Sequence, residues 1–438
     1  MNFDNMASLL QTSGAQAFKD NIVDQLIQGN NVIVYLPDYL IVDNLMKSIN
    51  DGLRKNGIPK INIANAANYD GPPTLTALMS AQPEMTKALR KKHFADYFKS
   101  SSKDMLLIRG IVNLDKFPSE SYGGIYKELT EACQATRSDI FSGKKPAGLR
   151  YLVVLSPRFP AFPNMEGTVS INWWGVTSNI DHMVLFKKAI NSLETKPTES
   201  MYWWLKAVCM GVGDDDPWLI SELVNKMPME LSEISDIIKS HPLNYSHSKT
   251  LTPQFEPEAQ FLLTGVSHEY PPPPENNGHR VLWAKGLLNP GGLCAYHPVV
   301  LAQNDTLLMK FVISGQVHVF FPLVEQVKDA IIQIVESRLG EGVWEHYIPL
   351  AKAREDMMFE IGPLSYHLKK NINPTDSRLS FLVNEMANLA YHWSKVRHLS
   401  AHHRICPYST LENAIKLYHE AEKYLDKNCP IGMKHKTN

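Results

Sequence analysis

The sequence predicts an α/β domain with a parallel sheet at the N-terminus, a small helical connecting region and an all-α bundle at the C-terminus. Three observations support this fold class. Continuous apolar runs alternate with helical stretches up to about residue 195, which is typical of a parallel sheet covered on both faces. Two short amphipathic helices follow, and a long amphipathic helix ends near Val396. We expect three segments, 1–195, 196–305 and 306–438.

The N-terminal segment contains four apolar runs that we expect to form strands. Continuous runs of this kind are typical of strands buried on both faces. Helices are expected over 15–28 and 41–56. The predicted strands lie at 32–36, 61–64, 105–110 and 149–156.

The turn after the first predicted strand lacks the sequence of a phosphate-binding loop. Residues 37–43 contain no Gly-x-x-x-x-Gly-Lys-Ser/Thr, and without glycine the backbone amides cannot wrap a triphosphate closely. The fourth strand ends in Ser156-Pro157, without an acidic pair to hold magnesium.

This layout resembles an inactive P-loop ATPase domain of the kind fused to effector modules in prokaryotic conflict systems. The resemblance implies a sensor, docking or oligomerisation role. It also implies no ATP hydrolysis, and a regulatory partner or phage trigger that binds at the N-terminal domain.

The connecting region is predicted to hold two short helices, 218–226 and 229–240, with a break at Met227-Pro228. This pattern is typical of a winged-helix or helix-turn-helix unit. Glu222, Glu230, Glu233 and Asp236 make these helices acidic, which favours a linker role over DNA reading. The residues Asp214-Asp215-Asp216 precede a proline and a helix, so they are better explained as an acidic N-cap than as a cation site.

Two aromatic pairs allow two interpretations. Trp173-Trp174 and Trp203-Trp204 are expected to pack in the core, and base stacking is the alternative. The run Pro271-Pro272-Pro273-Pro274 should be extended and semi-rigid.

Composition is that of a soluble globular protein, with 44% hydrophobic and 20% charged residues and a net charge of −1. The charge argues against a large non-specific phosphate footprint. The five cysteines show no paired spacing, which suits a reducing cytoplasm and disfavours a zinc cluster. The N-terminus lacks a basic region followed by an apolar stretch, so we expect no signal peptide. No uninterrupted apolar run approaches about 18 residues, so we expect no membrane span.

The chemistry is predicted at the end of the long C-terminal helix, around Arg397, His398 and His402. Arginine carries a permanent charge whose planar donors suit phosphate oxygens. Histidine gives and takes protons near neutral pH. Together they supply the base, the cation and the acid that metal-free RNA cleavage requires. The alternative is a basic helix terminus favoured by the helix dipole.

The segment from about Leu323 to Leu425 resembles the HEPN superfamily of small α-helical domains, many of which are metal-independent ribonucleases. Arg397, His398 and His402 match its signature of an arginine, a polar residue and a histidine a few positions on. The helix expected over 327–336 also resembles the family.

The resemblance implies a homodimer through the C-terminal helical domain, with both motifs facing one cleft. Arg397 would stabilise the phosphate, His402 would act as acid and base, and His398 would orient them or assist. His403, Arg404 and Lys395 would contact RNA, with His392 at the rim. No metal or cofactor is implied, and transfer RNA is a candidate substrate.

Two functions from different classes follow. The first is an endoribonuclease that leaves cyclic phosphate ends, acting in the cytoplasm as a toxin-like effector in phage defence or abortive infection. The second is a non-catalytic sensor or adaptor scaffold that dimerises through its helical domain. The near-neutral charge and the missing phosphate loop fit the scaffold as well.

Overall fold

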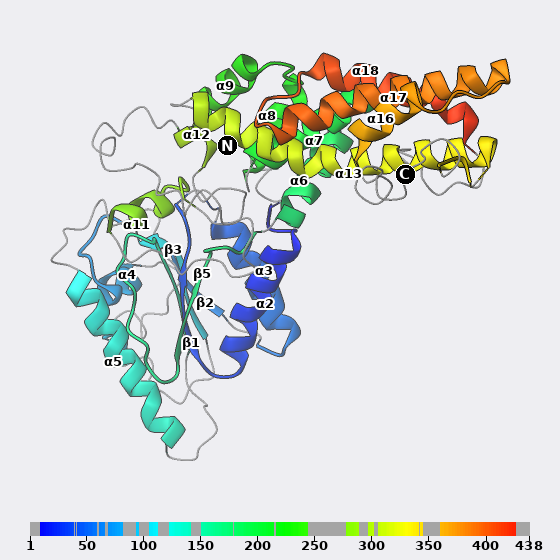
Figure 1. Cartoon of the computed structure of the whole chain (residues 1–438). Coiled ribbons are helices and arrows are strands. Elements are labelled where there is room, and N and C mark those ends of the chain that lie inside the picture. Colours follow the sequence, from blue (N-terminus) through cyan, green and yellow to red (C-terminus); the bar gives the residue numbers. More distant parts are fainter. Residues whose placement is uncertain are drawn as a thin grey trace. The chain divides into compact units, whose positions relative to one another are not determined.

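The computed structural model divides the chain into two compact units (Figure 1). One comprises Met1–Asp181 and Thr250–His297, and the other His182–Lys249 and Pro298–Asn438. The structure describes residues 9–38, 40, 42–58, 61–65, 69–81, 93–95, 105–112, 122–141, 150–177, 179–213, 216–243, 277–288, 297–301, 305–340, 342–344 and 360–425. The predicted proline-rich run at 271–274 lies outside these residues.

These units differ from the three segments expected from the sequence. The helices of the predicted connecting region belong to the same unit as the C-terminal helices, because their apolar faces are buried within it. The first division falls at Asp181, inside a helix, where no loop composition could have marked it.

A five-stranded parallel sheet forms the centre of the first unit, with the order β2-β3-β4-β1-β5. The four predicted strands are confirmed, and β5 was not predicted. Only one β5 residue, Ile171, is buried, so this strand lacks the continuous apolar run that identified the others. The strands are β1 (Asn31–Tyr35), β2 (Ile61–Asn65), β3 (Met105–Val112), β4 (Tyr151–Leu155) and β5 (Thr168–Asn172).

Helices lie on both sides of this sheet, α2 and α3 on one and α4 and α5 on the other (Figure 1). Thr12 caps α2 by accepting a hydrogen bond from the backbone of Ala15. Trp173 is fully buried and meets Phe18 of α2 edge to face, with ring centroids 5.0 Å apart. The helices are α2 (Ser13–Ile27), α3 (Val42–Lys55), α4 (Leu75–Ala81), α5 (Tyr122–Phe141) and α11 (Asn277–Ala284).

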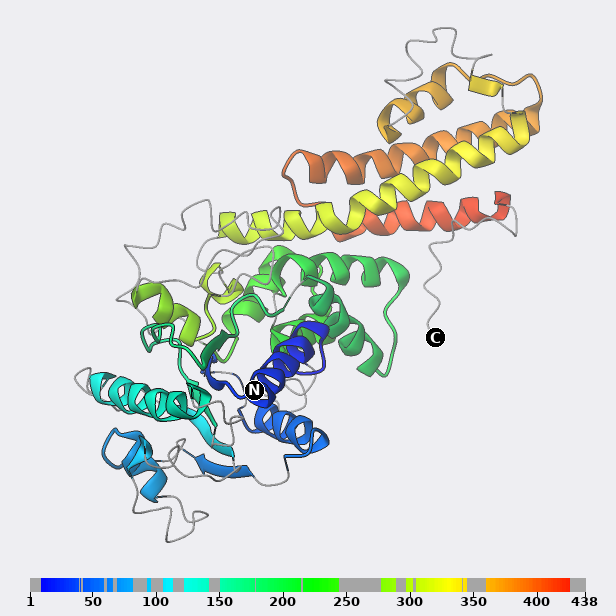
Figure 2. The same cartoon turned by 90° about the horizontal axis from the view of Figure 1, so that it is seen from below.

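The second unit is helical throughout its described residues, and α6 begins at the boundary between the units. Figure 2 shows α17 alongside the long helix α13, and α18 packs against α17 and α7. The helices are α6 (Asn179–Ser192), α7 (Glu199–Val212), α8 (Pro217–Lys226), α9 (Leu231–Lys239), α12 (Pro298–Leu301), α13 (Asp305–Leu339), α16 (Ile361–Lys370), α17 (Ser377–Ala401), α18 (Tyr408–Ala421) and the 3-10 turn η6 (Glu422–Tyr424).

The predicted helix pair of the connecting region is confirmed as α8 and α9. Asp216 caps α8 by accepting hydrogen bonds from the backbone of Trp218 and Leu219, as expected for an acidic N-cap. Met227 ends that helix in the left-handed conformation, with φ of 48°. A wing would need strands, and the described residues of this unit contain none.

Close contact between α7 and α13 sets the packing of the second unit. A Cβ on Gly211 would collide with the carbonyl oxygen of Phe311, and one on Gly315 with that of Ala207. Glycine at both positions therefore lets the two backbones approach each other.

Helix α13 is long and apolar enough to cross a membrane by length and composition, although the sequence predicted no membrane span. Its most apolar stretch is 56% buried by other parts of the protein, through packing against α7 and α17. A core helix of a soluble bundle has the same length and composition, and the burial of α13 fits that description.

Apolar periodicity predicted α17 well, but the start of α18 differs from the one that Ser409-Thr410-Leu411-Glu412 indicates, a pattern typical of a capping box. Leu382, Met386 and Trp393 are buried as expected. Instead of a capping box at Ser409, α18 begins at Tyr408 with Pro407 at the N-cap and no side-chain cap. Proline fits the start of a helix because its missing N–H would have no helical partner there.

Replacing Gly315 with Ala tests the contact between α7 and α13. Overpacking against a backbone carbonyl should outweigh the gain of about 1 kcal/mol in helix propensity, lowering the free energy of unfolding by about 1 to 2 kcal/mol. Hydrogen exchange of α7 and α13 amides at increasing urea measures the change. Gly362→Ala in α16 is the control, because a Cβ there meets no atom within 4 Å. Equal stability of the two variants would contradict the close contact.

Candidate functional site

The Arg/His motif lies at the C-terminal end of α17. Arg397 and His398 occupy its last turns, and His402 is the C-cap, donating its backbone N–H to the carbonyl of His398 at 3.0 Å. His403 follows in the left-handed conformation, with φ of 51°. The backbone of Arg404 then donates to Leu399 at 2.9 Å. These bonds close the helix into a tight turn, on which His398, His402, His403 and Arg404 are all exposed.

A buried glutamine on α13 fixes the chain just beyond this turn. The Gln316 side chain is fully buried, donates to the carbonyl of Cys406 at 3.0 Å and accepts from its N–H at 2.9 Å. Trp393 adds a second tie, because its indole N–H donates to the carbonyl of Ala414 in α18 at 3.0 Å. The end of α17 is therefore held from α13 and from α18.

A pocket of about 460 Å³ opens beside the motif. The first turn of α16, the end of α17 and the start of α18 form its walls. Its lining residues are Glu360, Ile361, Gly362, Ser394, Lys395, Arg397, His398, Leu399 and Thr410.

The pocket brings together three of the predicted residues, Arg397, His398 and Lys395. His402 is outside the lining, but its ring centroid lies 4.2 Å from that of His398. His403 and Arg404 follow on the turn and do not line the pocket.

Arg397 is held by a carboxylate that the sequence did not indicate. Its guanidinium lies 2.8 Å from Glu360 Oε1, and its side chain remains 32% exposed. The ring of Phe321 lies beneath the guanidinium, with its centroid 6.0 Å away. Since Glu360 precedes Arg397 by 37 residues, no local spacing could have predicted the pair.

Burial and charge affect two neighbouring titratable groups. Burial, aided by the Lys395 ammonium, lowers the pKa of His392. Burial raises the pKa of the Cys406 thiol to about 12, which makes this residue a poor nucleophile. Cys406 is fully buried, which makes it a packing residue.

Chemically, the site offers the Arg397 guanidinium and the Lys395 ammonium for phosphate oxygens and two imidazoles for proton transfer. Glu360 is the single carboxylate among the lining residues. A magnesium site usually requires more oxygen ligands than this lining supplies.

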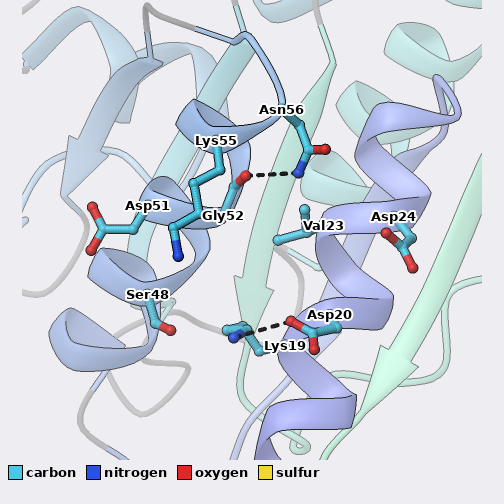
Figure 3. Close-up of a pocket in the computed structure, with 9 residues that line it drawn as sticks. All are labelled: Lys19, Asp20, Val23, Asp24, Ser48, Asp51, Gly52, Lys55 and Asn56. Carbon is cyan, nitrogen blue, oxygen red and sulfur yellow. Dashed lines mark hydrogen bonds and ion pairs between the residues drawn. The ribbon is translucent and has the colours of Figure 1, made fainter.

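A second pocket, of about 360 Å³, lies between α2 and α3 in the first unit (Figure 3). The charges along it are mixed, with Lys19 paired to Asp20 at 3.0 Å. Gly52 faces Val23, and a Cβ there would lie 3.0 Å from a Val23 methyl, so the helices approach closely at the pocket floor. We assign no function to this pocket. Its lining residues are Lys19, Asp20, Val23, Asp24, Ser48, Asp51, Gly52, Lys55 and Asn56.

The carboxyl ends of β1 and β4 mark the crevice where parallel α/β sheets bind ligands, because the chain crosses in opposite directions from these strands. Asp38 follows β1 and lies 2.9 Å from the Ser156 hydroxyl and 3.0 Å from the Arg158 guanidinium. The Asp38 carboxylate is therefore paired with a cation at this edge of the sheet.

Three of the four tryptophans in the two aromatic pairs pack in the core, as predicted. Trp173, Trp174 and Trp204 are buried, which removes the base-stacking alternative for these three rings. Trp203 is half-buried beneath the Lys206 ammonium, 4.6 Å from its ring centroid.

No protein-family model matches the chain, and no curated protein sequence matches it.

Replacing Gln316 with Met tests how the end of α17 is held. The variant keeps a similar volume but leaves the N–H and carbonyl of Cys406 buried without the glutamine amide. The free energy of unfolding of the second unit should fall by about 2 to 5 kcal/mol, measured by hydrogen exchange of α17 and α18 amides in urea. The exposed Gln326 of α13 is the matched control, and Gln326→Met should change stability by less than about 0.5 kcal/mol. A loss no greater than that in Gln316→Met would contradict the proposed role of the amide.

Proposed function

We propose that the protein is a metal-independent endoribonuclease whose active site is built from Arg397, His398 and His402. One observation carries the proposal. A cation and two imidazoles stand together, open to solvent, at the mouth of a pocket on the last turns of one rigid helix.

In this mechanism one histidine removes the proton from the 2′-hydroxyl, and the resulting oxygen attacks the adjacent phosphorus. Arg397 binds the phosphate oxygens as negative charge builds on them. A second imidazole protonates the departing 5′-oxygen. The products are a 2′,3′-cyclic phosphate and a 5′-hydroxyl. His402 acts as the acid/base, with His398 orienting it or assisting.

Glu360 has a defined place in this proposal. Its Oε1 atom lies 2.8 Å from the Arg397 guanidinium. An RNA phosphate must therefore compete with this carboxylate for the arginine. The pair is partly exposed, and such pairs contribute little to stability. A polyanion can therefore displace Glu360 at small cost.

The HEPN resemblance implies a homodimer in which two motifs face one cleft. In that dimer, His403, Arg404 and Lys395 would contact RNA. We place the enzyme in the cytoplasm as a toxin-like effector of phage defence, with transfer RNA as a candidate substrate. The first unit would act as a degenerate P-loop-like sensor. A first strand flanked by the fourth and fifth, as here, is the arrangement of many P-loop ATPases and supports that resemblance.

A non-catalytic scaffold is the second candidate, and one observation favours it. Arg397 already has a carboxylate partner within its own chain, so its charge is satisfied without RNA. Under this proposal the motif is a helix end that stabilises the bundle, and another protein supplies any activity.

His402→Ala and Arg397→Ala separate the two candidates. Each change should lower RNA cleavage by about 100-fold or more, because it removes proton transfer or phosphate stabilisation. Gel analysis of total RNA incubated with the full chain, with and without EDTA, measures cleavage. His93→Ala, which changes an exposed histidine of the first unit, is the control and should cut like the parent. Unchanged cleavage by folded His402→Ala would refute the mechanism.

A further inference from the structure

The exposed face of α17 carries large side chains that are not packed into the core of its own unit. Two of them are aromatic: Phe381 is 60% exposed and Tyr391 is 49% exposed. Large apolar side chains on a helix of a bundle normally point into the core, as Leu382, Met386 and Trp393 do here. The two rings therefore stabilise little within the described part of the chain.

These rings belong to one continuous stripe that leads to the motif. Positions three and four apart lie on one face of a helix. From Ser377 to His402 the stripe runs over about 37 Å, given a rise of about 1.5 Å per residue. Its exposed members are Ser377, Phe381, Asn384, Asn388, Tyr391, Lys395, His398 and His402.

The stripe carries no acidic residue. The one carboxylate of α17, Glu385, is half-buried to the side and is held by Lys423 at 3.2 Å and by the Tyr424 hydroxyl. Towards the motif the stripe becomes cationic, and the Lys395 ammonium lies 4.3 Å from the Tyr391 ring centroid. An anion is favoured at this end, and a ring with an adjacent ammonium suits a base beside its phosphate.

We propose that this face of α17 binds single-stranded RNA, with Tyr391 and Phe381 as stacking platforms. The inference rests on the proposed ribonuclease function and names its substrate class. Unstacked bases bind aromatic side chains, whereas a duplex keeps its bases paired and presents phosphates. Asn384 and Asn388 lie between the rings and offer amide groups to base edges. An RNA strand bound along this face would bring one of its phosphates to Arg397.

A second copy of the chain could also bind this face of α17, but the composition of the stripe suits a protein interface less well than it suits RNA. Phe381 and Tyr391 lie about 15 Å apart along the helix with two amides between them. A dimer core is a continuous apolar patch with few charges. The outcome of the experiment distinguishes the two.

Binding of a fluorescent 12-nucleotide 2′-O-methyl RNA to the full chain tests the proposal. This probe has no free 2′-hydroxyl, so it reports binding without cleavage. Tyr391→Ala and Phe381→Ala should each weaken binding by about 5- to 100-fold, the range found for one stacked base. Tyr391→Phe should retain affinity within about two-fold. Lys395→Ala should lower the slope of log affinity against log salt by about 0.7.

Tyr366→Ala is the matched control, because this tyrosine is 61% exposed but lies on α16. It should bind like the parent. Equal loss in Tyr366→Ala and Tyr391→Ala, or no loss in Tyr391→Ala and Phe381→Ala, would overturn the proposal. Dissociation of a dimer by Tyr391→Ala in sedimentation experiments, with unchanged RNA affinity, would assign the face to a second copy instead.

Failure here is distinguishable from failure of the proposed function. If the parent binds the probe through Tyr391 but cuts no RNA, the nuclease proposal fails and the binding face stands. If the parent cuts RNA and Tyr391→Ala leaves KM unchanged, the binding face alone is wrong.

Discussion

The two hydrogen bonds between Gln316 and the backbone of Cys406 are the constraint on which the candidate site depends. They bury an amide on α13 against the backbone N–H and carbonyl of one residue, where a missing partner is costly. The chain leaving α17 must therefore turn back at His402 and His403. Pro407 then begins α18 at once. Since α13 itself lies close against α7 through Gly211 and Gly315, the position of the motif is tied to the core of the second unit.

Sequence periodicity predicted the helices and strands whose burial follows a regular pattern. It did not predict features that depend on contacts between residues far apart in the sequence. The runs that became β1 and β4 are buried at every position, and α17 buries one regular face. By contrast, β5 buries only Ile171. The pairing of Glu360 with Arg397 and the bonds from Gln316 to Cys406 join residues far apart in the sequence. Neither contact has a local pattern, so the sequence could indicate the motif but not what holds it.

The site combines a rigid support with a cation that is paired but accessible. Arg397 is partly exposed and bound to one carboxylate, an arrangement that a polyanion can displace. On the proposed account, the same helix presents the reactive groups at its end and a carboxylate-free face along its length. In the first unit, Asp38 follows β1 and is paired with Arg158 at the carboxyl edge of the sheet.

The chemistry of the cut ends tests the central claim most directly. An RNA cleaved by the parent protein in EDTA would be compared with the same RNA carrying one 2′-deoxy nucleotide on the 5′ side of the scissile phosphate. If the 2′-hydroxyl is the nucleophile, the unmodified RNA should yield a 2′,3′-cyclic phosphate and the modified bond should remain intact. Cleavage of the deoxy-substituted bond, or products with 5′-phosphates, would contradict the account.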